Sequence, residues 1–222
     1  MRTKVFSSAV AILFGVSGLT LATPARGAET FPNPPKIDMS APQAKESIVL
    51  AGGCFWGMQG VFEHVKGVTS TVVGYAGGKK ETAHYERVEE GDTGHAESIK
   101  ITYDPSKITL GEIYKIYFSA AHDPTTLNYQ HNDRGPQYRS SIFYANDEQK
   151  RIAESYIAQL DQAKVFSNKI VTQVVPLKAF YPAEAYHQDY YRLHPNNPYI
   201  VFNDAPKVAN LRQEFPNLYT GK

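Results

Sequence analysis

The fold of this chain is decided around Gly52-Gly53-Cys54-Phe55-Trp56-Gly57, which follows the apolar run Ser47-Ile48-Val49-Leu50-Ala51. The apolar run predicts a short buried strand that ends at the glycine pair. Beyond this stretch, apolar residues recur at helical spacing, namely Met58, Val61, Phe62 and Val65. The stretch therefore predicts a tight connection between a strand and a helix, with Cys54 at its centre.

Cys54 is the only cysteine of the chain, and Trp56 is the only tryptophan. Unpaired backbone N–H groups and the helix dipole favour negative charge at a helix start. We therefore expect the Cys54 thiol to ionise more easily than a free thiol, and the thiolate is the reactive form. A single cysteine is more often buried and inert. Here the glycine pair removes side-chain cover and two large rings follow on a turn, so we favour a nucleophile.

Length and composition indicate one globular domain with extensions. The chain has 222 residues, of which 42% are hydrophobic, and its formal net charge is +1. This balanced charge gives no indication of binding to nucleic acid or to a membrane surface. We expect a monomer.

Residues 1–28 predict a secretory signal peptide. Arg2 and Lys4 precede an apolar run over 5–22, and small residues then offer cleavage sites after Ala25, Gly27 or Ala28. An uncleaved anchor is the alternative, although the serines and glycines of the run suit a membrane span poorly. We therefore expect an exported protein of a bacterial periplasm, with no membrane attachment after cleavage.

The remaining chain divides into an arm and a domain. Residues 29–46 are rich in proline and predict an extended arm. After the helix that follows Cys54, the domain at 47–222 is predicted to hold strands at 68–75, 98–103, 140–145 and 170–176, and helices at 110–121, 147–163 and 183–193, before an irregular tail from His194. Thr109 is a predicted helix cap. The order predicts an α/β (α+β) fold, a two-layer sandwich with a mixed sheet and with its long loops near the thiol.

Two of these long loops carry polar groups. The first, 79–95, leads to Glu97 just before the predicted strand 98–103. A glutamate at a strand start is usually exposed, but the alternating pattern equally allows Glu97 to face inward. A carboxyl group buried near aromatic rings has a raised pKa and can act as a general acid. The second loop, 122–137, includes Asn132-Asp133-Arg134-Gly135-Pro136, residue types that also dominate ordinary turns, so a turn and a site both remain open there.

The chain has seven histidines, and their spacings match neither HExxH nor a Cys/His zinc signature, so we expect no metal. Any of these histidines could pair with Cys54 in a thiol hydrolase. No papain-like or caspase-like sequence surrounds the cysteine, so this hypothesis stays secondary. A third hypothesis is a non-catalytic module that binds peptides on Phe55 and Trp56. An unpaired thiol in an exported protein also allows an intermolecular disulfide.

Four separated blocks resemble class A of the peptide methionine sulfoxide reductase family. They are GCFWG at 53–57, GYAGG at 74–78, TGHAE at 93–97 and NDRGPQYRS at 132–140. The resemblance covers roughly residues 47–200. It implies a ferredoxin-like α/β plait with extensions. It also implies reduction of methionine S-sulfoxide, in peptides and proteins and as the free amino acid.

The resemblance also implies roles for individual residues. Cys54 matches the nucleophile that attacks the sulfoxide sulfur, and Glu97 matches the acid that protonates the sulfoxide oxygen. The phenols that hydrogen-bond that oxygen match Tyr85 and Tyr138. The residues that bind the rest of the substrate are Phe55 and Trp56, which hold the methyl group, and Asp133, a further polar residue of the pocket.

The chain departs from the resemblance at one point. Many relatives carry further cysteines that resolve the oxidised nucleophile, and this chain has none. We therefore expect a Cys54 sulfenic acid that is reduced by an external thiol, either a thioredoxin-like protein or a small thiol. No bound cofactor is expected. The expected partners are this reductant and the oxidised peptides and proteins that serve as substrates.

Overall fold

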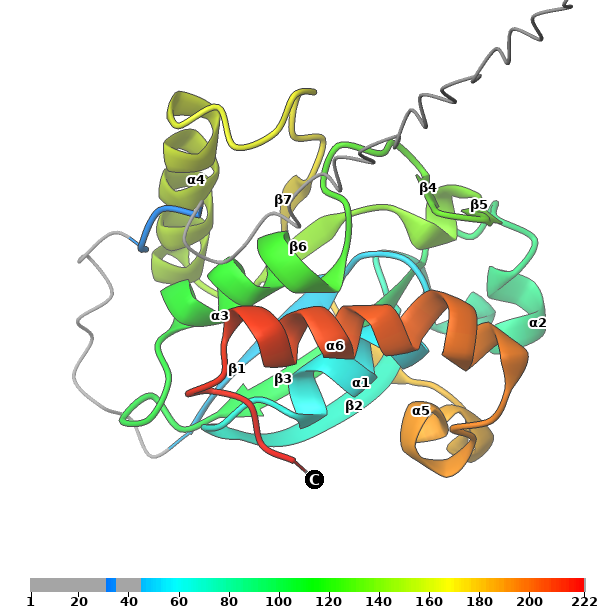
Figure 1. The fold of residues 1–222 in the computed structure, drawn as a ribbon. Helices are drawn as coiled ribbons and strands as arrows, with labels where there is room; N and C mark the ends of the chain where they lie inside the picture. The colour runs from blue at the N-terminus through cyan, green and yellow to red at the C-terminus, as the bar shows by residue number, and fades with distance from the viewer. Residues whose placement is uncertain (1–30, 35–44, 222) are drawn as a thin grey trace, which may run out of the picture.

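A six-stranded sheet runs through the molecule in the order β7-β6-β1-β3-β2-β8 (Figure 1). The computed structural model describes residues 31–34 and 45–221. The strands are β1 (Glu46–Ala51), β2 (Val68–Ala76), β3 (Ala96–Tyr103), β6 (Ser141–Tyr144), β7 (Gln173–Pro176) and β8 (Phe180–Pro182). Neighbouring strands pair antiparallel except β6 and β7, which pair parallel. The sheet is mixed, which confirms the predicted fold class.

Helices cover one face of this sheet (Figure 1). They are α1 (Phe55–Glu63), α3 (Leu110–Ile116), α4 (Asp147–Gln162) and α6 (Ala205–Glu214). Thr109 caps α3 as predicted, because its hydroxyl accepts from the Glu112 N–H while the Glu112 carboxylate accepts from the Thr109 N–H. The helix continues as a π-helical turn at Tyr117–Ala121.

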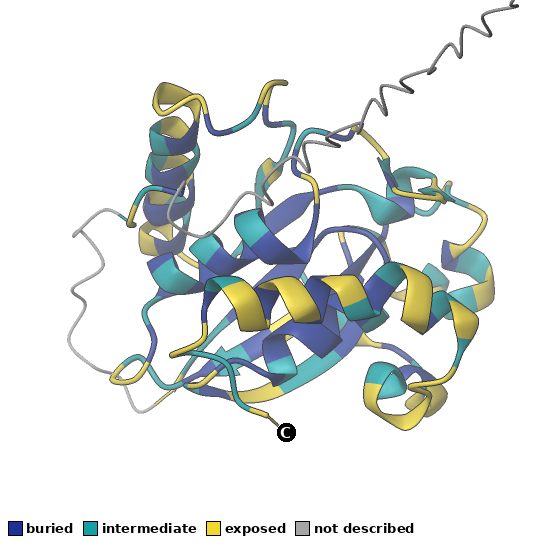
Figure 2. Cartoon of the chain, in the orientation of Figure 1, coloured by how far each residue is buried: buried dark blue, intermediate teal, exposed yellow. Residues whose placement is uncertain are grey.

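The main core lies between this face and the helices. Leu50 of β1 is paired with Ile99 of β3, and Ile48 with Ile101. Because side chains alternate across a strand, all four face the helices, where they are buried (Figure 2). On the other face a smaller cluster forms around Val49, Ala51, Ala76, Ala96 and Phe143. The result is the predicted two-layer arrangement, with Glu97 on the helix side two residues before Ile99.

The helix predicted at 183–193 is wrong. The segment forms a 3₁₀ turn at Ala185–His187 and a short helix α5 at Tyr190–Leu193, separated by Asp189 with φ 57°. The Gln188 side chain accepts from the Val73 N–H at 3.0 Å and donates to the Val73 carbonyl at 3.0 Å. This amide therefore pairs with strand β2 like a piece of backbone, and the pairing interrupts the helix.

The tail from His194, predicted to be irregular, is largely helical. A π-helical turn at Ile200–Asp204 leads into α6. Pro206 lies in the first turn of α6, where its missing N–H is no loss. Val208 and Leu211 are buried in the main core. Burial of these two side chains in the core thus stabilises a helix that was not predicted, because the tail is rich in proline and asparagine.

Smaller differences concern boundaries. The predicted strand 170–176 shortens to β7, and β8 was not predicted. Glu97 lies inside β3 rather than just before it. The long loops hold a 3₁₀ turn at Lys80–Thr82, a short helix α2 (Tyr85–Val88), a small hairpin of β4 (Tyr129–Gln130) and β5 (Asp133–Arg134), and a 3₁₀ turn at Pro136–Tyr138. The long loops are therefore folded pieces rather than open segments.

The described part of the arm, residues 31–34, is fixed to the domain. The Phe31 ring is buried against Phe166, with ring centroids 5.7 Å apart. The Pro32 carbonyl accepts from the Tyr156 hydroxyl of α4 at 3.1 Å. The predicted signal peptide, 1–28, lies outside the described residues. In the described part of the chain, no helix is long and apolar enough to cross a bilayer.

Replacing Phe31 with alanine should lower the free energy of unfolding by about 3 kcal/mol, because a buried aromatic ring is removed from the core. Phe202→Ala is the control, since Phe202 is 78% exposed and its loss should change stability by less than about 0.5 kcal/mol. Urea unfolding followed by circular dichroism measures both. Equal stabilities of Phe31→Ala and wild type would show that the arm contributes nothing to the fold.

Candidate active site

The glycine pair allows a loop to lie directly on the turn that holds Cys54. Strand β1 ends at Ala51, and Cys54 is the N-cap residue of α1, as predicted. Gly53 has φ +85°, a conformation that favours glycine, and a Cβ atom there would lie 2.8 Å from Gln130. A Cβ atom on Gly52 would lie 2.8 Å from the His122 ring. The glycines therefore admit the loop 122–130, which covers the turn instead of leaving it open.

This covering loop is held by buried polar contacts. Gln130 donates to the Asp123 carbonyl at 2.6 Å and accepts from the Asp123 N–H at 3.0 Å. His122 Nε2 lies 2.7 Å from Ser140 Oγ, and its Nδ1 lies 2.9 Å from the Tyr117 carbonyl. The Tyr117 hydroxyl in turn donates to the Ala51 carbonyl at 2.7 Å, at the end of β1. The loop and the strand before Cys54 are thus fixed as one unit.

Glu97 lies beside the first turn of α1. The Phe55 N–H donates to Glu97 Oε2 at 2.9 Å, and Glu97 is only 2% exposed. Burial raises the pKa of Glu97 well above its usual range, and the nearby Glu89 and Asp133 carboxylates act in the same direction, while the hydrogen bond from Phe55 lowers it. Such a group keeps its proton at a pH where an ordinary glutamate has lost it.

The structure reverses the expectation that the Cys54 thiol ionises easily. Cys54 is 7% exposed, and burial raises the pKa of its thiol well above the usual range. The charges of Glu97 and Asp204 raise this pKa further, whereas Lys207 and the Trp56 N–H lower it. The favourable helix start is therefore outweighed by loss of solvation and by two nearby carboxyl groups.

Tyr85 and Tyr138 reach the site from the two folded loops. The Tyr85 N–H donates to Glu184 Oε1 at 3.0 Å, which fixes the start of α2. Burial raises the pKa of the Tyr85 phenol, and the charges of Glu89, Glu97 and Cys54 raise it further. Burial raises the pKa of the Tyr138 phenol, and the charge of Glu97 raises it further. Both hydroxyls therefore stay protonated at neutral pH and can donate hydrogen bonds.

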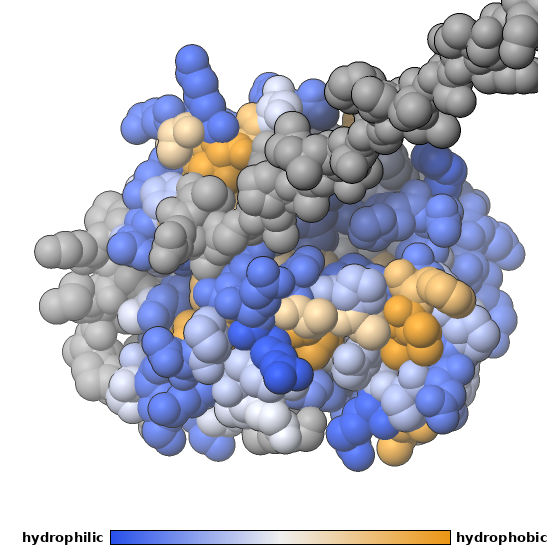
Figure 3. Space-filling view, viewed as in Figure 1, coloured by the Kyte–Doolittle hydropathy of each residue, from blue (hydrophilic) through white to orange (hydrophobic). Residues whose placement is uncertain are grey.

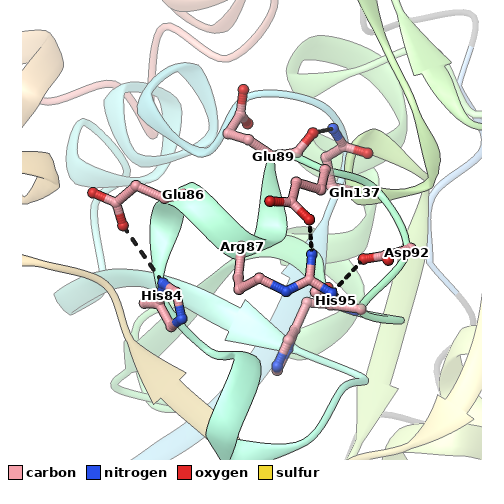
Figure 4. Close-up of polar contacts among 9 residues, drawn as sticks. His84, Glu86, Arg87, Glu89, Asp92, His95 and Gln137 are labelled. Atoms are coloured by element: carbon pink, nitrogen blue, oxygen red, sulfur yellow. Dashed lines mark hydrogen bonds and ion pairs between the residues drawn. The ribbon is translucent and has the colours of Figure 1, made fainter.

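The Tyr138 hydroxyl is engaged in this structure. It donates to Glu89 Oε1 at 3.0 Å. The neighbouring Gln137 amide donates to the Glu89 carbonyl at 3.1 Å (Figure 4). Arg87 crosses the same loop to Asp92 at 2.8 Å. Arg139 donates to the His95 carbonyl at 3.0 Å. These contacts join the segment 84–95 to the turn at 136–139 and so set where Tyr138 and Glu97 lie.

Trp56 is enclosed by aromatic residues that no sequence motif predicted. Its ring stacks on Tyr190, with centroids 3.8 Å apart and planes at 10°, and meets Tyr199 edge-on at 5.8 Å. Its indole N–H donates to His187 Nδ1 at 3.1 Å. All three partners come from the region expected to be a plain helix and an irregular tail. The dense tyrosines of 185–199 were the available signal.

Asp133 closes the site from the β4–β5 hairpin. Its carboxylate accepts a hydrogen bond from the Tyr199 hydroxyl. Burial raises the pKa of Tyr199, and the charges of Cys54 and Asp133 raise it further. Contacts of Glu97 with Phe55, of Tyr85 with the cluster around Cys54, and of Asp133 through Tyr199 with Trp56 bring these predicted residues to the start of α1, whereas Tyr138 is hydrogen-bonded to Glu89. Among the described residues, no group of three or more His, Cys, Asp and Glu side chains is arranged to hold a metal ion.

Comparisons with known proteins agree with this geometry. The sequence model of the family "Peptide methionine sulfoxide reductase" matches residues 46–218. The chain is 59% identical to peptide methionine sulfoxide reductase MsrA 2 of Mesorhizobium japonicum, over 84% of this chain and 95% of that protein. It is 49% identical to MsrA 2 of Synechocystis, over 77% of this chain and 79% of that protein.

Two solved structures are also similar. Reduced Mxr1 from Saccharomyces cerevisiae is 35% identical with a TM-score of 0.63, over 72% of this chain and 91% of that one. Methionine sulfoxide reductase A of Corynebacterium diphtheriae is 32% identical with a TM-score of 0.60, over 76% of this chain and 85% of that one.

His122 should make stability depend on pH. Burial lowers the pKa of His122 from 6.5 to about 4 in the folded protein, so between these values only the unfolded chain binds the proton. The free energy of unfolding should therefore fall by up to about 3 kcal/mol on this account as pH drops from about 6.5 to about 4. In His122→Gln this part of the pH slope should disappear, whereas His84→Gln, at an exposed site, should keep it. Urea unfolding across this pH range measures the slopes, and an unchanged slope in His122→Gln would assign the effect elsewhere.

Proposed function

The chain belongs to the peptide methionine sulfoxide reductase family, and from its site we propose a mechanism built on Cys54 and Glu97. It is an oxidoreductase that reduces methionine sulfoxide to methionine, an activity that repairs oxidative damage. In our proposal Cys54 attacks the sulfoxide sulfur while Glu97 delivers a proton to the sulfoxide oxygen.

One contact carries this proposal. The Phe55 N–H holds Glu97 Oε2 at 2.9 Å, which fixes the carboxyl group beside the residue that follows the nucleophile. Oε1 is then the oxygen that carries the proton, and burial keeps the proton in place by raising the pKa of Glu97. A neutral carboxylic acid close to a thiol is the arrangement that acid-assisted attack on a sulfoxide requires.

The proposed step balances in atoms and protons. Glu97 gives its proton to the sulfoxide oxygen as the Cys54 sulfur bonds to the substrate sulfur. The oxygen, now a hydroxyl, passes to the Cys54 sulfur and methionine departs. The S–H proton released by Cys54 restores the Glu97 acid. Enzyme sulfur is thereby oxidised to a sulfenic acid and the substrate sulfur is reduced.

Aromatic residues would bind the rest of the sulfoxide side chain. Phe55 and Trp56 offer ring faces to the S-methyl group, and sulfur–aromatic contacts stabilise binding by about 1 kcal/mol each. Tyr190 and the indole contact to His187 hold Trp56 in one orientation. Tyr85 and Tyr138 donate to the sulfoxide oxygen, Tyr138 by leaving Glu89, and Asp133 acts through Tyr199. The resemblance to class A implies the S epimer as the substrate.

The surface beside the site supports the proposal that peptides and proteins are substrates. The face shown in Figure 3 is largely hydrophilic, with small hydrophobic patches along α6. The large hydrophobic side chains exposed in the described part are Leu127, Tyr186, Leu193, Val201 and Phe202. Apart from Leu127, they lie in the segment 186–202 that encloses Trp56, so apolar residues flanking an oxidised methionine would find partners there.

The thiol hydrolase hypothesis has no matching contact. Among the described residues no histidine is hydrogen-bonded to Cys54, and His122 and His187 contact Ser140 and Trp56 instead.

The domain at 47–222 is proposed to act after export, as a monomer of a bacterial periplasm. The export part of that proposal rests on the sequence of residues 1–28.

Regeneration must use a thiol from outside the chain. Cys54 is the only cysteine, so no second thiol of the same chain can condense with its sulfenic acid. An external thiol attacks the sulfenic acid, releases water and forms a mixed disulfide. A second thiol then resolves this disulfide and frees Cys54. A thioredoxin-like protein supplies both thiols from one molecule, whereas a small thiol must react twice.

Glu97→Gln should slow methionine formation in a single turnover by about 10²–10⁴-fold, because an amide cannot supply the proton. Glu86→Gln is the matched control, since the Glu86 side chain is 78% exposed and its loss should leave the rate unchanged. Rapid-quench measurement of methionine from a sulfoxide peptide gives both rates. A wild-type rate in Glu97→Gln would remove this residue from the acid role.

Without any reductant, one equivalent of enzyme should form about one equivalent of methionine and stop, since the thiol is consumed in the step. Intact mass should then show one added oxygen, and dimedone should trap it at Cys54. Cys54→Ser should form no methionine. Loss of two hydrogens with no dimedone adduct would indicate a sulfenamide and refute a persistent sulfenic acid. Repeated turnovers without a thiol would refute the whole mechanism.

A further inference from the structure

A buried ion pair lies behind the first turn of α1. Asp204 ends the π-helical turn and Lys207 lies in the first turn of α6, three residues later. Asp204 is 0% exposed and Lys207 is 7% exposed. Lys207 Nζ lies 3.1 Å from Asp204 Oδ1. Neither residue belongs to the blocks or to the roles described above.

Gly57 brings this pair against the turn that holds Cys54. Gly57 is three residues after Cys54, and a Cβ atom there would overlap Asp204 Oδ1 and lie 2.8 Å from Lys207 Nζ. Any side chain at 57 would push the two charges away from the helix start. The glycine that ends GCFWG therefore has a reason in this fold, which is to admit a carboxylate and an ammonium group beside the catalytic turn.

The Asp204 carboxylate of this pair is not fully hydrogen-bonded. Asp204 Oδ2 is buried and has no hydrogen-bond partner among the described residues. Burying a carboxylate with one oxygen unpaired is costly, and a buried ion pair can often be replaced by apolar side chains without loss of stability. A pair retained at this cost beside a reactive thiol points to an electrostatic role.

We propose that the buried Asp204–Lys207 pair controls how readily the Cys54 thiol ionises. Lys207 supports negative charge on the sulfur, and Asp204 opposes it. The inference rests on the proposed role of Cys54 as the reacting thiol. Its effect on the sulfur is through space, from behind the first turn of α1.

Charged and titratable groups face Cys54 from each element packed on it. Glu97 comes from β3, Tyr85 from α2, Tyr199 from the segment after α5, and the ion pair from the start of α6. Asp204 acts with Glu97 to raise the pKa of the Cys54 thiol, and Lys207 lowers it. In the resting enzyme the sulfur therefore keeps its proton. When the S–H proton leaves during attack, the ammonium group offsets the new charge.

Opposite charge substitutions test the proposal. Lys207→Met should lower the thiolate fraction at a fixed pH below the midpoint about 10-fold, and Asp204→Asn should raise it about 10-fold, each a shift of about one pKa unit. Thiolate is measured by ultraviolet absorbance or by the rate of iodoacetamide alkylation, neither of which needs substrate. Lys207→Arg, which keeps the charge, should retain the wild-type titration.

An exposed pair of the same spacing supplies the control. Lys107 Nζ lies 3.0 Å from Asp104 Oδ2, and the two side chains are 61% and 23% exposed. Lys107→Met and Asp104→Asn should leave the Cys54 titration unchanged. Shifts of the same sign in Lys207→Met and Asp204→Asn, or no shift in either, would overturn the proposal.

The folding state of the variants decides between structural and electrostatic roles. If Lys207→Met does not fold, Asp204→Asn still gives the sign of the effect, because it keeps the cation and removes only the carboxylate. A lowered thiol pKa in Asp204→Asn with wild-type circular dichroism supports the proposal, and an unchanged or raised one refutes it. Failure of the proposed function is seen separately, as sulfoxide reduction by Cys54→Ser.

Discussion

The rest of the site depends on the hydrogen bond from the Phe55 N–H to Glu97 Oε2, which joins the first turn of α1 to strand β3. It connects residues 42 positions apart in the chain, one at the first turn of α1 and the other in β3. Because β3 is central in the sheet and α1 packs on that sheet, neither end can move without disturbing the core. The acid and the thiol thereby keep a fixed relation before any substrate arrives, which is the kind of preorganisation that catalysis uses.

Burial decides the electrostatics around this contact. A helix start favours a thiolate, yet the environment of Cys54 favours the neutral thiol because solvation is lost and carboxyl groups are near. The same burial keeps Glu97 and the tyrosine phenols protonated. The reacting thiol, the acid and the phenols are therefore neutral in the resting enzyme, and they lie beside the buried Asp204–Lys207 ion pair. A neutral resting thiol is also less easily oxidised by peroxide than a thiolate.

The features set by local pattern could be predicted from the sequence, and those set by distant contacts could not. The alternation in 98–103 and the glycine pair before Cys54 gave β3, β1 and the start of α1 correctly. The segment 183–193 failed because Gln188 pairs with Val73, more than a hundred positions earlier. Tyr190 and Tyr199 were missed because their stacking on Trp56 has no local signature. The helix-start argument for Cys54 failed because it took no account of burial.

The described part of the arm, residues 31–34, lies far from the site. Phe31 and Pro32 lie on the side of α4, whereas α2 and α5, which border the site, lie at the opposite end of the molecule (Figure 1). A group joined to the chain before Phe31 therefore starts from the back of the enzyme. A tether, a carrier domain or a solid support on the side of Phe31 would lie away from α2 and α5. The enzyme could thus work while immobilised, with large oxidised proteins approaching from the free side.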